Sequence, residues 1–302
     1  MTVRRRLPGT QTVTTLFHFA MVSRIMIMNS DTFRKLYLAK ISILTSLILF
    51  AYSPIFAWMV DRWIATDTYY SHGFVVPLIS AFIVWRNLKK MNRVEIVPSK
   101  LGWLFFIPGI LIYAISAFLH VFFSSGFALI VILIGLVLLF FGKNFLKQLL
   151  FPIFFLSLMI PLPMFATSDI SFKLRIFSTH MAMLFINTLG IPAVREGSVI
   201  KTMHSYILVE DQCSGIRALI ALVALGALVS YFGKMSRKKK IILFLFSIPI
   251  ALLSNIIRIV ALSFVSEIYG AETAMGVFHS AAGFFAFVFA FLGFLLVSKL
   301  LE

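Results

Sequence analysis

Three side chains that can carry out acyl transfer interrupt the apolar C-terminal half of the chain: Cys213, Arg258 and His279. A cysteine thiolate can attack a carbonyl carbon, a guanidinium can stabilise the resulting oxyanion, and an imidazole can carry the proton. Each also has an ordinary structural explanation, because a lone cysteine commonly packs in a core and an arginine near a helix end commonly reaches the headgroups. Their placement along the chain has to decide between these explanations.

Cys213 is the only cysteine in 302 residues, and it opens a long apolar helix. Unpaired N–H groups and the helix dipole favour a thiolate at such an N-terminus. Asp211 is the predicted N-cap, and Ser214 and Gly215 keep the first turn uncrowded. Arg217 follows Cys213 by four residues, so the two side chains are predicted to share one helix face.

The three candidate residues are predicted to lie at one depth in a membrane. Counted from the basic residue at the cytoplasmic end of each helix, Cys213, Arg258 and His279 lie about 31, 27 and 30 Å away. Asn255 stands three residues before Arg258 on the same predicted face and can orient its side chain. The small residues 280–283 leave room beside His279 for close approach of another helix.

Composition sets the class of protein. The chain is 61% hydrophobic and 13% charged, with a mean hydropathy of +1.01, which is typical of a polytopic membrane protein. The net charge of +16 is explained by basic cytoplasmic loops, so no nucleic-acid partner is predicted. A single cysteine excludes an intramolecular disulfide and a CxxC metal site, and there is no HExxH motif. We therefore predict neither a metal nor a cofactor.

The predicted fold class is an all-α integral membrane protein, with a cytoplasmic extension at 1–37, a membrane domain at 38–298 and a tail at 299–302. Basic clusters fall on alternating loops, which places both termini in the cytoplasm and the three candidate residues near the opposite face. About eight transmembrane helices are predicted, of which the second is interrupted by Pro77: 38–60, 70–85, 101–120, 124–142, 147–165, 213–232, 241–264 and 278–298.

One long segment, 166–212, is predicted on the extracytoplasmic side. Its first half, 168–190, has Lys, Arg and His among apolar residues and indicates an interfacial helix, although a ninth span is an alternative. Its second half places Val and Ile around a turn at Glu196-Gly197, which predicts a short β-hairpin leading to Cys213.

The motifs CSGIRAL, NIIRI and FHSAAG, together with GIPAVREGSVI and SHGFVVPLISAFIVW, resemble the exosortase and archaeosortase family of multi-pass cysteine transpeptidases. The resemblance covers roughly residues 38–298. It implies that Cys213, Arg258 and His279 form the catalytic triplet. His72, in the SHG stretch, falls near the same predicted face, where a structural role is a better explanation than lining the site.

The resemblance also implies the substrate and the setting. Substrates would be exported, membrane-anchored proteins that end in a short motif such as Pro-Glu-Pro, a transmembrane helix and a basic tail. Cleavage through a thioester would remove that tail, and an acceptor nucleophile of unknown identity, or water, would resolve the intermediate. The expected location is a bacterial inner membrane, with the active site at the periplasmic face.

Two functions of other classes remain open from the residues alone. In a transporter, Arg258 and His279 would line a path across the bilayer, but such proteins commonly show repeats and mid-membrane polar groups, which this chain lacks. In a scaffold subunit of a polysaccharide export system, Cys213 would be dispensable.

Overall fold

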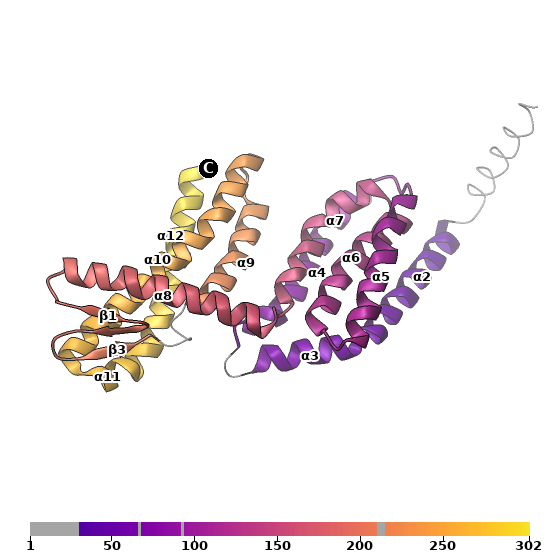
Figure 1. The fold of residues 1–302 in the computed structure, drawn as a ribbon. Helices are drawn as coiled ribbons and strands as arrows, with labels where there is room; N and C mark the ends of the chain where they lie inside the picture. Colours follow the sequence, from indigo (N-terminus) through magenta and orange to yellow (C-terminus); the bar gives the residue numbers. More distant parts are fainter. Residues whose placement is uncertain (1–29, 66–67, 92–93, 210–214) are drawn as a thin grey trace, which may run out of the picture. The chain divides into compact units, whose positions relative to one another are not determined.

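The computed structural model describes most of the chain, and Figure 1 shows its ribbon. It contains two compact units, residues 1–56 and 57–302. The first unit holds helix α2 (Ser30–Ala51) and the start of α3 (Ser53–Ile64), and the candidate site lies wholly in the second. The described residues are 30–65, 68–91, 94–209 and 215–302.

Prolines set where several helices begin. The predicted span 38–60 is not one helix, because α2 ends before Tyr52 and α3 begins after it, with Pro54 in its first turn. The predicted span 70–85 starts as a 3₁₀ turn, η1 (Ser71–Phe74), before α4 (Val75–Met91). At 17 residues, α4 is about 25 Å long and shorter than the hydrocarbon layer of about 30 Å.

The next two helices follow the prediction closely. After η2 (Lys100–Gly102) come α5 (Trp103–Phe118) and α6 (Phe122–Phe140). They pack tightly, because a Cβ added to Gly135 of α6 would stand 2.6 Å from the backbone nitrogen of Phe106 in α5. Small residues thus bring the two backbones together.

The predicted span 147–165 ends early. Helix α7 (Lys143–Phe155) and η3 (Leu156–Met159) stop before Pro161 and Pro163, and α8 (Met164–Thr188) starts at an angle of 84° to them. The helix predicted at 168–190 is therefore α8, which begins four residues earlier and crosses the long helix α10 described below (Figure 1).

A small antiparallel sheet follows α8. Strands β1 (Val194–Glu196) and β2 (Val199–Lys201) meet across a turn at Gly197, and the sequence did not predict the third strand, β3 (Tyr206–Leu208). Ile200 on β2 faces Ile207 on β3 across the ladder. Both are buried with apolar residues of α8 and α10, so one face of the sheet belongs to a core.

Three apolar helices complete the fold: α9 (Ile216–Phe232), α10 (Arg237–Tyr269) and α12 (Val277–Leu301), the last two joined through the short α11 (Ala271–Met275). Helix α10 contacts both α9 and α12 (Figure 1). A small buried cluster joins them: Leu222, Ala251 and Ala290.

The start of α9 corrects two predictions. The helix begins at Ile216, not at 213, and its N-cap is Gly215, not Asp211. With 17 residues, α9 is about 25 Å long. Cys213 lies outside the described residues, so the shared helix face of Cys213 and Arg217 remains a prediction.

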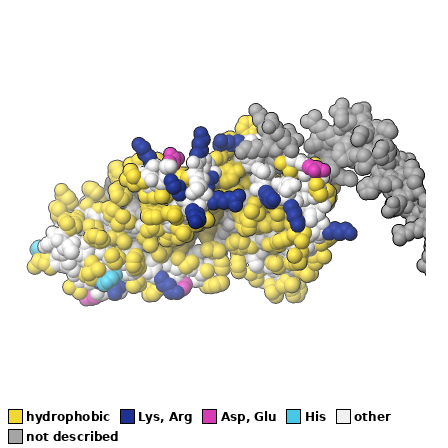
Figure 2. All heavy atoms as spheres, turned by 90° about the horizontal axis from the view of Figure 1, so that it is seen from above, with side chains coloured by type: hydrophobic (Ala, Val, Ile, Leu, Met, Phe, Trp, Pro, Cys, Tyr) yellow, Lys and Arg dark blue, Asp and Glu magenta, His cyan; other side chains and the backbone are white. Residues whose placement is uncertain are grey.

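By length and composition, four described helices are long and apolar enough to cross a membrane, or six if each of two bent pairs is one span. The chain is thus a multi-pass membrane protein, and the prediction of eight spans is not confirmed. Figure 2 shows Lys and Arg side chains gathered on the face where α9 and α12 end and α10 begins. The basic residues at or next to these ends of α9, α10 and α12 are Lys234, Arg237, Lys238, Lys239, Lys240 and Lys299.

Candidate active site

Arg258 and His279 meet directly. Nη2 of Arg258, on α10, donates to Nε2 of His279, the third residue of α12, over 2.9 Å, and to the backbone oxygen of His279 over 3.3 Å. A guanidinium has only donors, so Nε2 must be the acceptor. The contact therefore fixes a neutral imidazole whose hydrogen is on Nδ1.

Small residues let α12 approach α10 at this point. A Cβ added to Gly283, one turn after His279, would stand 3.4 Å from Nη2 of Arg258. One turn before Arg258, the hydroxyl of Ser254 donates to the backbone oxygen of Ala286. The small stretch that the sequence placed beside His279 thus allows the guanidinium to lie against α12.

The N-terminus of α9 lies against the same helix. Gly215 has a φ of +82°, and a Cβ there would stand 2.8 Å from Cγ of Asn255. Asn255 is only 3% exposed and precedes Arg258 by three residues on α10. Cys213 and Ser214 lie outside the described residues, so the position of the thiol remains a prediction.

The sheet that precedes Cys213 is fastened to the far end of α10. Glu267 accepts from the hydroxyl of Thr202, and its Oε1 lies 2.7 Å from Nδ1 of His204. The hydroxyls of Ser205 and Ser266 are 2.6 Å apart. These bonds and the shared core hold the sheet against α10.

The remaining predicted site residues are not at the Arg258–His279 pair. His72 is half-buried and stacks on Tyr70 with ring centroids 6.0 Å apart, which favours a structural role. Arg217, the second residue of α9, is exposed and lines a cavity.

That cavity has a volume of about 580 Å³ and brings together residues that are distant in sequence. Arg62 of α3 and Arg175 of α8 join Arg217 in its wall. Sequence reasoning noted Arg175 only as a basic residue of an interfacial helix and did not single out Arg62, because nothing local connects them. Among the residues that the structure describes, no three His, Cys, Asp or Glu side chains are grouped as metal ligands.

The helices and the half-buried polar pair define a multi-pass membrane protein with a polar site where the starts of α9 and α12 meet the C-terminal half of α10. Residues 63–296 match the sequence model of the transmembrane exosortase family, Exosortase_EpsH. The chain therefore belongs to the transmembrane exosortase family. Comparison with curated proteins gave no match. Comparison with solved structures gave none either.

Proposed function

We propose that this protein is a membrane-embedded cysteine transpeptidase or protease that removes the C-terminal sorting signal of exported proteins. The observation that carries the proposal is the 2.9 Å contact between Arg258 and His279, on the helix against which Gly215 packs. Family membership supports the same class of activity. Cys213, two residues before Gly215, is the proposed nucleophile.

The proposed chemistry assigns one task to each group. Sγ of Cys213 attacks the scissile carbonyl carbon, and the guanidinium of Arg258 stabilises the oxyanion. As a hydrogen bond of Arg258 shifts from Nε2 of His279 to that oxyanion, Nε2 becomes free to take the thiol proton. The C–N bond then breaks, the leaving amine takes that proton from His279, and a thioester remains on Cys213.

The proposed substrates are membrane-anchored proteins whose C-terminus consists of a short motif, a transmembrane helix and a basic tail. An acceptor nucleophile or water attacks the thioester and regenerates the thiol. We place this site at the extracytoplasmic face of a bacterial inner membrane, with both termini in the cytoplasm. The basic face in Figure 2 supports this orientation, because Lys and Arg gather on the cytoplasmic side of membrane proteins.

The test is co-expression of the protein with a tailed substrate that carries an epitope after its basic tail. Cys213→Ala and Cys213→Ser are expected to leave the substrate full-length, and His279→Ala is expected to slow loss of the epitope. His180→Ala is the matched control, because His180 lies exposed on α8. Normal processing by Cys213→Ala would exclude the enzyme and leave the transporter and the scaffold.

A further inference from the structure

The cavity beside the start of α9 carries a chemistry that the acyl-transfer step does not use. Of the described residues that line it, every charged one is an arginine: Arg62, Arg175 and Arg217. They come from three separate helices, α3, α8 and α9. We propose that this cavity binds an acidic side chain of the substrate peptide and so holds the peptide beside the nucleophile, an inference that rests on the proposed function.

The arginines suit a carboxylate. A guanidinium presents a planar fork that matches a carboxylate with two hydrogen bonds, which a lysine ammonium does not. Nη2 of Arg62 contacts Sδ of Met164 over 3.7 Å, a weak acceptor that an anion would readily replace. Arg175 lies over the ring of Phe172, with its Cζ 5.6 Å from the ring centroid, within the limit of about 6 Å for a cation–π contact.

The rest of the wall suits a peptide. The cavity volume of about 580 Å³ falls within the range of about 300–1,000 Å³ that is typical of ligand sites. The wall combines hydroxyl-bearing side chains with apolar and aromatic ones. The lining residues other than the arginines are Trp58, Ala65, Thr68, Tyr69, Tyr70, Pro161, Leu162, Pro163, Met164, Thr167, Ser168 and Leu208.

The position along the chain favours the substrate over a lipid. Arg217 is four residues from Cys213, so their Cα atoms are at most about 14 Å apart even if the chain between them is fully extended. A carboxylate bound by Arg217 is therefore within reach of a peptide whose scissile carbonyl is at the thiol, since each residue of an extended peptide spans about 3.3–3.6 Å. A lipid phosphate at this position would compete with the substrate.

The experiment measures binding apart from cleavage. Full-length Cys213→Ala protein in nanodiscs of zwitterionic lipid is titrated with a fluorescent, tailed substrate and with versions whose acidic residues upstream of the membrane helix are changed to amides. Loss of one carboxylate is expected to weaken binding about tenfold or more. Arg62→Gln and Arg217→Gln are expected to weaken binding of the parent substrate and to remove its advantage over the amide version.

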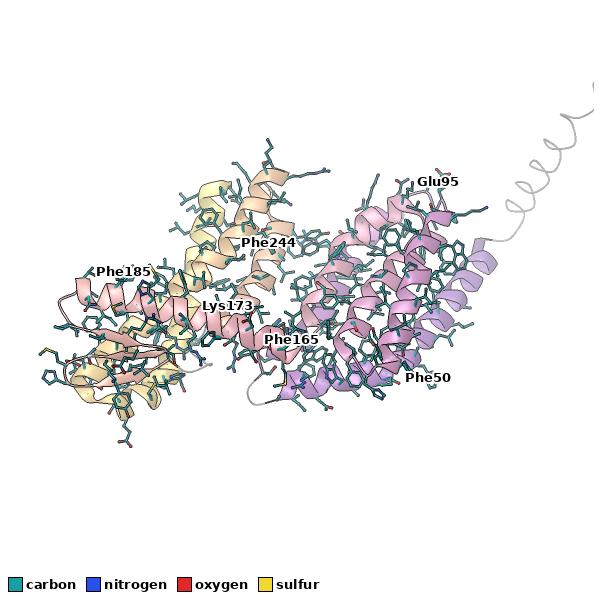
Figure 3. The ribbon with its side chains drawn as sticks, in the orientation of Figure 1. Phe50, Glu95, Phe165, Lys173, Phe185 and Phe244 are labelled. Atoms are coloured by element: carbon teal, nitrogen blue, oxygen red, sulfur yellow. The ribbon has the colours of Figure 1, made fainter. Side chains whose placement is uncertain are left out.

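Two further variants separate a charge contact from a structural effect. Lys173→Gln is the matched control, because Lys173 lies on α8 two residues before Arg175 (Figure 3), is 72% exposed and pairs with Asp169 over 2.8 Å. The Lys173→Gln variant should bind the tailed substrate as tightly as the protein without this substitution does. Arg62→Glu should recover affinity for a substrate in which the recognised acid is changed to lysine, a result that misfolding cannot produce.

The outcomes distinguish the two proposals. Equal binding of the acidic and amide substrates by the Cys213→Ala protein would overturn the carboxylate site. A preference for the acidic substrate that is lost only when the nanodiscs contain phosphatidylglycerol would also overturn it. That second result would assign the cavity to a lipid phosphate. Processing by Cys213→Ala would instead overturn the enzyme mechanism and leave the binding result standing.

Discussion

The guanidinium of Arg258 donates to Nε2 of His279 from the neighbouring helix over 2.9 Å. This contact has a chemical consequence, because the lone pair that would accept a thiol proton is occupied while the bond lasts. Under the proposed mechanism, Arg258 therefore keeps His279 neutral until a substrate oxyanion takes over one of its hydrogen bonds.

Arg258→Lys tests this arrangement. Lysine keeps the charge but loses the planar fork, so it cannot serve both the imidazole and the oxyanion. We expect processing to slow by about 10²-fold or more, the usual cost of losing an oxyanion donor. The measurement is the rate of substrate cleavage in membranes. Arg195→Lys, at a surface site where Nη1 donates to the backbone of Gly197 over 2.9 Å, should cleave at the parent rate.

Gly215→Ala tests the packing of the N-terminus of α9 against Asn255. The substitution places a Cβ 2.8 Å from Cγ of Asn255 at a φ of +82°, so it combines a clash with backbone strain. Gly190→Ala isolates the strain, since φ is +87° there and nothing lies within 4 Å of the added atom. Strain alone costs about 1–2 kcal/mol, and we expect a larger loss at Gly215.

Thermal unfolding in detergent and the cleavage rate measure both variants. Asn255→Ala in the Gly215→Ala background should restore part of the lost stability, because it removes Cγ and Nδ2, the two atoms closest to the added Cβ. Equal destabilisation by Gly215→Ala and Gly190→Ala would mean that the start of α9 does not pack on Asn255.

Glu267→Ala tests the attachment of the sheet to α10. It removes the acceptor of Thr202 and the partner of His204, and the loss of such bonds is expected to destabilise the region by about 1–3 kcal/mol. Amide hydrogen exchange across 199–208 should become faster, and processing should slow because this segment leads into Cys213. Glu272→Ala, at an exposed position on α11, is the control and should change neither.

The orientation can be measured because the chain has a single cysteine. In a Cys213→Ala background, we expect Lys143→Cys to react with a membrane-impermeant maleimide only after cells are opened. Glu272→Cys is expected to react in intact spheroplasts. Both residues are exposed on the protein surface. The reverse pattern would place the candidate site in the cytoplasm and contradict the positive-inside argument.

The sequence alone determined the membrane class, because hydropathy is a local property that a run of apolar residues carries whatever it packs against. For the same reason it located α5, α6 and α12 to within a few residues. It also singled out Arg258 and His279, since a polar group within an apolar helix is conspicuous in one dimension.

Only the tertiary structure decided the features that depend on distant contacts. The turn of 84° after η3 and the N-cap at Gly215 shortened two predicted spans, and the third strand pairs through a core shared with α8 and α10. Arg62 and Arg217 are 155 positions apart in the chain, yet they line one cavity. No local pattern encodes such a meeting, because the packing of whole helices brings the two side chains together.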